Sequence, residues 1–118
     1  MHGDEGLPYN FIAAAEGIPN WTERLAQLTQ KYEDAQERAN PDFQQVHGYT
    51  KDAPGKANMS MCTSQVAERF DCLAMTLEMP FKDNANIPDA KQGWSPERAK
   101  KLGYSCVDAI ASVIDELR

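Results

Sequence analysis

The strongest hydrophobic pattern in the chain is the apolar run Leu73–Phe81 (LAMTLEMPF), which contains one carboxylate, Glu78. A continuous apolar run closed by Pro80 is typical of a strand that is buried on both faces. Alternation along a strand places Leu73, Met75, Leu77 and Met79 on one face and Ala74, Thr76 and Glu78 on the other. A buried carboxylate has to be neutral, paired or close to a cation, because removing its charge from water is costly. Alternatively, the buried run ends at Glu78 and the carboxylate lies in water.

The helical period is clearest in the segment Trp21–Ala39, which is apolar on one face and charged on the other. Asn20 is its expected N-cap, with Glu23 completing a capping box, and Asn40-Pro41 ends it. The last segment predicts a second long helix, capped by Ser95 with Pro96 in the first turn. Its broad apolar stripe consists of Leu102, Cys106, Ala109, Ile110, Val113, Ile114 and Leu117.

The middle of the chain predicts shorter elements. Phe43–Tyr49 is expected to form a short strand, and Ser60–Phe70 a short helix with Val66, Ala67 and Phe70 turned inward. The polar stretches Lys51–Asn58 and Lys82–Gly93 are expected to be loops. Strands that alternate with helices indicate a layered α/β fold, and 118 residues suit a single domain, 1–118.

The charge and composition of the chain argue against several classes of protein. The net charge is -6, which argues against a nucleic-acid-binding protein. No apolar run approaches the length of a membrane span. Three cysteines without CxxC spacing favour reduced thiols in a cytoplasmic protein, and no nucleophile or nucleotide-binding motif is present.

The opening segment, MHGDEGLPYNF, has the composition of a functional loop, and it is either an exposed tail or part of something longer. His2, with Asp4 and Glu5, could contribute to a metal site, although a complete site needs about three protein ligands on rigid elements. His47, the other histidine, is expected to be structural, at the end of a strand.

Several segments together resemble the zinc metallocarboxypeptidases, in particular the bacterial branch close to the cytosolic carboxypeptidases. His2–Glu5, followed by Leu7–Phe11, resembles the family's third zinc-ligand segment, and Thr76–Glu78 resembles the motif that carries its general-base glutamate. Gly55–Asn58 lies where the cytosolic subgroup has a Gly-Thr-Ala-Arg-like segment, and Lys101–Tyr104 resembles the start of its C-terminal helix.

This resemblance implies a layered mixed sheet flanked by helices, corresponding to the C-terminal half of a carboxypeptidase domain of the phosphorylase/hydrolase-like fold. It makes His2 a zinc ligand and Glu78 the general base, with weaker assignments of Tyr49 and Asn58 to substrate binding. Asn58 stands where an arginine is expected, which weakens a preference for glutamate side chains. The family's first two zinc ligands and its carboxylate-binding arginines would lie upstream of His2.

The expected function is that of a zinc-dependent carboxypeptidase, of which this chain is an incomplete C-terminal part with little activity or zinc affinity of its own. The expected partners are a peptide substrate and the missing N-terminal half, and an exposed sheet edge favours self-association. The alternative is a non-catalytic α/β interaction module with a vestigial ligand loop and an acidic surface.

Overall fold

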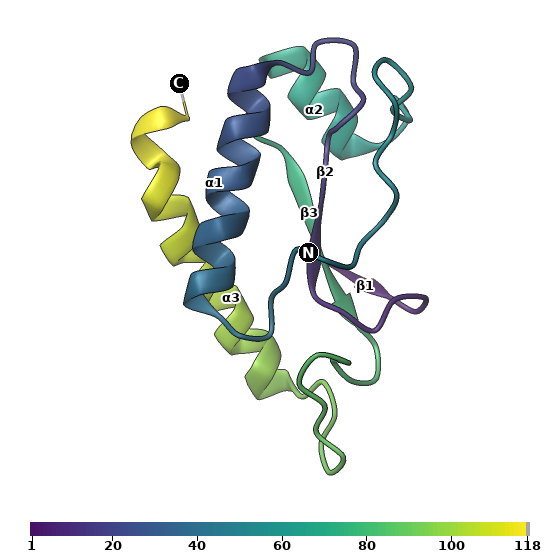
Figure 1. Ribbon diagram of the computed structural model, residues 1–118, viewed down its shortest axis with the longest axis vertical. Coiled ribbons are helices and arrows are strands. Elements are labelled where there is room, and N and C mark those ends of the chain that lie inside the picture. The colour runs from purple at the N-terminus through teal and green to yellow at the C-terminus, as the bar shows by residue number, and fades with distance from the viewer. Residues whose placement is uncertain (118) are drawn as a thin grey trace.

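A mixed three-stranded sheet with helices packed against it forms the fold in the computed structural model, which describes residues 1–117 (Figure 1). The elements in chain order are β1 (His2–Asp4), β2 (Phe11–Ala14), α1 (Glu23–Ala39), α2 (Cys62–Phe70), β3 (Met75–Pro80), α3 (Pro96–Val113) and the 3₁₀ helix η1 (Ile114–Glu116). The expected α/β class with a mixed sheet is confirmed.

The central strand of the sheet is β3, with the order β1-β3-β2. It pairs in parallel with β1, where Glu78 is the register partner of His2, and antiparallel with β2, where Glu78 is the partner of Phe11. Leu77 and Glu78 point to opposite faces and are both buried, each 5% exposed. The prediction of a strand buried on both faces is therefore confirmed, although β3 begins two residues later than Leu73.

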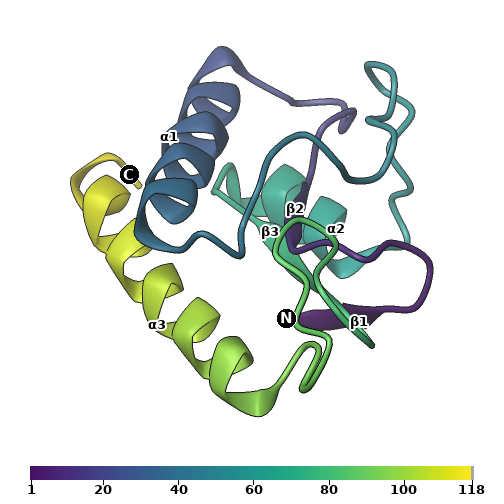
Figure 2. The ribbon, with the colours of Figure 1, turned by 60° about the horizontal axis from the view of Figure 1, so that its bottom comes forward.

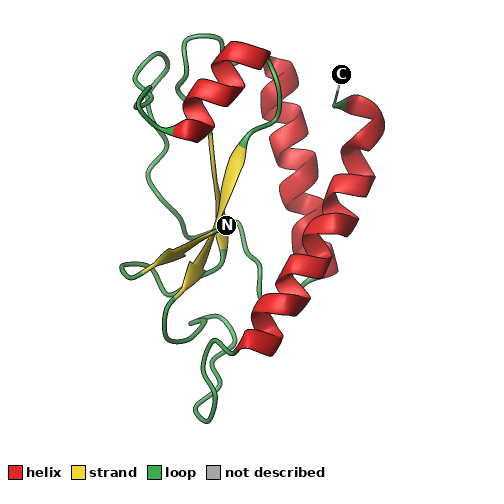
Figure 3. Ribbon diagram, turned by 180° about the vertical axis from the view of Figure 1, so that it is seen from behind, coloured by secondary structure: helices red, strands yellow, loops and turns green. Residues whose placement is uncertain are grey.

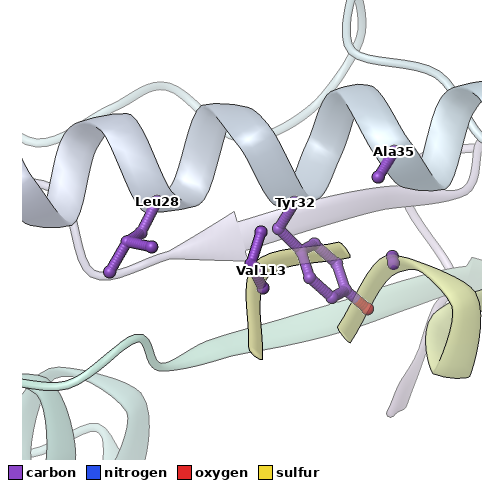
Figure 4. Close-up of a cluster of buried hydrophobic side chains, with 5 residues drawn as sticks. Leu28, Tyr32, Ala35 and Val113 are labelled. Carbon is purple, nitrogen blue, oxygen red and sulfur yellow. The ribbon is translucent and has the colours of Figure 1, made fainter. Parts of the chain in front are cut away.

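The main core lies between the sheet and the helices α1 and α3, which run side by side along one of its faces (Figures 1 and 2). Figure 4 shows Leu28 and Tyr32 on the same side of α1, with Val113 of α3 beside the Tyr32 ring. Ile12, Leu73 and Met75 pack against this cluster from the sheet side. The side of β3 that carries Met75 and Leu77 therefore packs against the two long helices.

On the Glu78 face, the short helix α2 covers the first half of β3. Its Ala67 is buried together with Ala15, Ile18 and Leu25, and Ala74 packs against this second cluster. The Thr63 and Thr76 hydroxyl oxygens lie 3.0 Å apart. Helix α2 therefore covers Thr76 but not Glu78. Loop segments lie over the part of this face around Glu78.

A partly buried ionic network fixes the start of α3. The guanidinium of Arg98 binds the carboxylate of Asp42 through two nitrogens, at 2.5 and 3.1 Å, and Asp83 at 3.1 Å. It also donates to the carbonyl oxygens of Gly93 and Ile87. Asp42 follows α1 and Asp83 follows β3, so this one side chain joins three parts of the chain.

One predicted helix start and one predicted strand are wrong. Helix α1 begins at Glu23 because the Thr22 side chain accepts the N–H of Leu25 at 3.2 Å, whereas Asn20 binds Glu68 of α2. The segment Phe43–Tyr49 is not a strand. Its one sheet-like contact is a bridge between Phe43 and Asn10, because the Gln44 side chain accepts two nearby backbone N–H groups and holds the segment in a turn.

One inward-facing assignment is wrong, and one expected apolar stripe is too broad. Phe70 is 66% exposed because it ends α2, and Asp71 then turns the chain away at a φ of 45°. The apolar stripe expected on the last helix is buried only in part. Leu102, Ala109 and Val113 of this stripe are buried, together with Ser105, whereas Ile110 of α3 and Ile114 of η1 are 47% and 58% exposed.

Candidate functional site

The carboxylate of Glu78 lies beside the imidazole of His2. As register partners on neighbouring strands, the two side chains project from the same face of the sheet. The Nδ1 atom of His2 lies 2.9 Å from Oε2 of Glu78. The Glu78 side chain is 6% exposed, whereas the His2 side chain is 67% exposed. The carboxylate is thus sheltered and hydrogen-bonded, and its solvent-exposed alternative is wrong.

The opening segment also differs from its expected form. His2–Asp4 is a strand of the sheet instead of a loop or an exposed tail. This strand pairing gives His2 a defined position relative to Glu78, which the sequence of the opening segment does not reveal.

Phe11 flanks Glu78 on the side opposite His2 and is covered by the segment 44–52. Phe11 is 2% exposed. The Tyr49 ring meets it edge-on, with centroids 4.9 Å apart. Gly48 lies so close that a Cβ there would be 3.1 Å from the Phe11 ring. The segment therefore crosses this face of the sheet and brings Tyr49 into the same cleft as Glu78.

Asp4 anchors Tyr49. The Tyr49 hydroxyl donates to the Asp4 carboxylate, which also accepts the backbone N–H groups of Gly6 and Leu7 at 2.6 and 2.7 Å. The tyrosine hydrogen bond, followed by that from Leu7, holds the pKa of Asp4 below its ordinary value. Burial, and then the bond to Asp4, raises the pKa of Tyr49. Asp4 therefore shapes the turn after β1 and positions Tyr49, a role that sequence reasoning missed.

A cleft of about 270 Å³ opens in front of this arrangement. Its walls are β2, the segment 44–52 and the beginning of α2, and Glu78, Tyr49 and Asn58 all line it. The Asn58 side-chain oxygen accepts the N–H and the hydroxyl of Ser60, at 3.0 and 2.7 Å. The structure thus places the two weakly assigned residues in one cleft with the carboxylate.

The far end of the cleft carries charge that the sequence analysis did not single out. Lys51 forms an ion pair with Glu16 at 2.9 Å, and Glu33 of α1 lies beside this pair. Burial raises the pKa of Glu33 to about 7, against the opposing effect of Lys51. No periodic or motif signal marks Glu33, because it occupies a flank of an ordinary amphipathic helix.

The metal-binding capacity of the described residues is incomplete. Within residues 1–117, no group of three or more His, Cys, Asp and Glu side chains is placed to hold a metal ion. Next to Glu78 the chain offers one imidazole, His2. His47 stacks on Tyr9 instead, with ring centroids 4.1 Å apart. The donor set fits one ligand of a zinc site and not a whole site.

No protein-family model matches the sequence. An uncharacterised protein of Zymomonas mobilis is 46% identical over 117 residues, which are 99% of this chain and 31% of that protein. Among solved structures, a candidate carboxypeptidase A of Shewanella denitrificans is 54% identical with a TM-score of 0.95, covering 97% of this chain and 30% of that one. A metallo-carboxypeptidase of Pseudomonas aeruginosa, in complex with (2-guanidinoethylmercapto)succinic acid, is 42% identical with a TM-score of 0.95, covering 98% and 31%.

In all of these matches, the chain covers a similar fraction of the related protein. It spans less than a third of the length of each of these proteins, while nearly all of its own residues are matched. Identities above 40% at TM-scores of 0.95 extend the resemblance from short motifs to the whole described fold. In sequence and in fold, this chain is similar to a segment of these carboxypeptidases that makes up about 30% of the length of each.

Proposed function

We propose that residues 1–118 are the C-terminal portion of the catalytic domain of a zinc-dependent carboxypeptidase, which hydrolyses C-terminal residues from peptides. The observation that carries the proposal is the sheltered carboxylate of Glu78, held 2.9 Å from an exposed histidine nitrogen on the adjacent strand. The similarity to metallo-carboxypeptidases supports the same reading.

In this proposal Glu78 is the general base. Its carboxylate accepts a proton from the attacking water and passes it to the leaving amine. Its burial, at 5% exposure, keeps bulk water away from the base. His2 supplies one imidazole nitrogen to the metal from the edge of the sheet. When bound, zinc lowers the pKa of water and polarises the peptide carbonyl.

The cleft beside Glu78 would receive the C-terminal residue of the peptide, with Tyr49 and Asn58 on its walls. The succinic acid derivative bound by the Pseudomonas relative carries carboxyl groups, as a C-terminal residue does. The remaining metal ligands, and groups that hold the substrate carboxylate, would come from the part of the domain outside this chain. The chain by itself should therefore bind zinc weakly and hydrolyse little.

A cytoplasmic location goes with this proposal. Cys62, Cys72 and Cys106 form no disulfide within the described chain. None of the helices in residues 1–117 is long and apolar enough to cross a membrane.

The test is hydrolysis by the complete protein that contains this segment, with a Glu78→Gln variant and an exposed control, Glu23→Gln on α1. Removal of the base should lower kcat by at least about 100-fold while the control stays active. Release of the C-terminal amino acid from short peptides, followed by mass spectrometry, measures this.

The second candidate is a non-catalytic interaction module, which the incomplete donor set among the described residues favours. A complete protein that hydrolyses no peptide with zinc present, and whose behaviour Glu78→Gln leaves unchanged, would support the module and reject the peptidase.

A further inference from the structure

We propose that the far end of the Glu78 cleft selects peptides that end in lysine or arginine, and that Glu16 and Glu33 recognise the positive charge of that last residue. This inference rests on the proposed function, because it takes the cleft as the place where the C-terminal residue of the peptide lies. The far end, called here the charged end, is lined by Glu16, Glu33, Lys51 and Asp52.

The outer edge of β2 makes the wall of this cleft polar. All four residues of Phe11–Ala14 line it, and loops, not a further strand, lie beside this edge of the sheet (Figure 3). The Asn10 carbonyl accepts the N–H of Gln44 on this side, so alternation along an antiparallel strand turns the N–H and C=O groups of Ile12 and Ala14 outward as well. Among residues 1–117, nothing bonds to Ile12 or Ala14 on that side. An apolar substrate side chain would bury these backbone groups without partners, whereas an ammonium or guanidinium can donate to the carbonyl oxygens.

The charge at this end favours a positive side chain. Its ionisable groups are the three carboxyls of Glu16, Glu33 and Asp52 and the one ammonium of Lys51. The Glu16 side chain is 17% exposed, whereas that of its partner Lys51 is 71% exposed. An ion pair with so exposed a partner is held loosely. A substrate cation can therefore share the Glu16 carboxylate or displace Lys51 from it.

Glu33 supplies a second carboxyl, which has no ion-pair partner of its own among residues 1–117. Burial raises its pKa to about 7, and Lys51 acts on it in the opposite direction without a hydrogen bond. A lysine or arginine side chain beside Glu33 would favour its ionised form and offset the cost of burying it. The position of Glu33 on the flank of α1 is thus accounted for by a cationic ligand.

A negative side chain fits the charged end less well. It would face Glu33 and compete with Glu16 for the ammonium of Lys51. Asn58 adds no positive charge, and its side-chain oxygen is already used by Ser60.

The length of the cleft also favours lysine and arginine. Phe11, at the beginning of β2, is the register partner of Glu78, whereas Glu16 lies beyond the end of that strand. A peptide held with its last amide next to Glu78 can reach the Glu16 carboxylate only through a long side chain. Lysine and arginine combine that length with the required charge.

The test is hydrolysis, by the complete protein that contains this segment, of peptides that differ only in their last residue. Lysine is compared with norleucine, which has the same carbon chain without the ammonium, and with glutamate. The value of kcat/KM should be at least about tenfold higher for lysine than for norleucine, and lowest for glutamate. Glu16→Gln and Glu33→Gln should each lower the lysine-to-norleucine ratio by at least about fivefold. Glu23→Gln, on the exposed start of α1, is the control and should keep the ratio of the parent.

Binding is measured separately, by calorimetry with acetyl-lysine and acetyl-norleucine, each blocked at the α-amino group. Where the protein hydrolyses none of the peptides, tighter binding of acetyl-lysine that is lost in Glu16→Gln upholds the charged end and rejects the peptidase, whereas equal or undetectable binding rejects both. Hydrolysis with no preference for lysine over norleucine rejects the charged end and upholds the peptidase. A lysine preference that survives in both Glu16→Gln and Glu33→Gln would also overturn the proposal, because other residues would then recognise the charge.

Discussion

His2 and Glu78 face each other across two parallel strands, with Nδ1 of the imidazole 2.9 Å from Oε2 of the carboxylate. The glutamate side chain is 6% exposed and enclosed by the fold, whereas the histidine side chain is 67% exposed. In the proposed function, this pair is a general base beside a single metal ligand. This asymmetry explains why a site can be well formed around Glu78 and still lack a complete set of metal donors.

Zinc binding by the isolated chain should be weak. A catalytic zinc site uses three protein ligands, and the described residues place one imidazole next to Glu78. Isothermal calorimetry with zinc should show no tight one-to-one isotherm, and His2→Ala should change the heats little. Tight stoichiometric binding by the monomer, lost in His2→Ala, would show that the chain carries a complete site.

The Asp4–Tyr49 contact should be measurable as a coupling energy. Tyr49→Phe removes one hydrogen bond to a carboxylate and should cost about 1 kcal/mol in the free energy of unfolding. Asp4→Asn should cost about 2 kcal/mol, because it also weakens two bonds from backbone N–H groups. A double-mutant cycle by urea denaturation should give a coupling of about 1 kcal/mol. Strictly additive effects would mean that the contact contributes nothing to stability.

Glu33 should make the chain less stable as the pH rises. Its pKa is raised from 4.5 to about 7 by burial, so between these values the folded state holds a proton that the unfolded state has released. The contribution of Glu33 to stability therefore falls from about pH 4.5 upward and levels off above pH 7. Glu33→Gln should be more stable than the parent by about 1 kcal/mol at pH 8, a figure reduced for solvent screening.

The difference between Glu33→Gln and the parent should be small near pH 4, where the carboxyl is mostly protonated in both states. Urea denaturation at pH 4, 6 and 8 measures it. Glu23→Gln, exposed at the start of α1, serves as the control and should follow the parent. A constant difference at all three pH values would assign the effect to packing and not to ionisation.

Arg98 should matter far more than a neighbouring surface lysine. Arg98→Met leaves the carboxylate of Asp42 buried without its cation and should cost about 3 kcal/mol. Lys100→Met removes an exposed pair with Glu97 and should cost at most about 0.5 kcal/mol. Thermal unfolding followed by circular dichroism compares the two variants. Similar melting temperatures would show that the Arg98 network adds no stability.

Local sequence signals predicted the long elements well. Helix α3 begins where Ser95 and Pro96 indicated, because capping depends on neighbouring backbone groups. The signals failed where distant partners compete. Asn20, a suitable N-cap by type, binds Glu68 of α2 instead, and Gln44 holds its segment in a turn through its own side chain. The apolar stripe on the last helix was too broad, because Ala109 and Val113 are buried whereas Ile110 is exposed.

The features of the candidate site likewise fall into those that the sequence indicated and those that only the structure shows. The run LAMTLEMPF by itself indicated a doubly buried strand, because strand alternation is a local property, and it left open whether the Glu78 carboxylate is buried or in water. Only the tertiary structure decided that this carboxylate faces His2, that Asp4 holds Tyr49, and that Glu33 lies beside the Lys51–Glu16 pair at the far end of the cleft. These relationships depend on strand register and loop crossings between residues far apart in the chain, which no local pattern of side chains encodes.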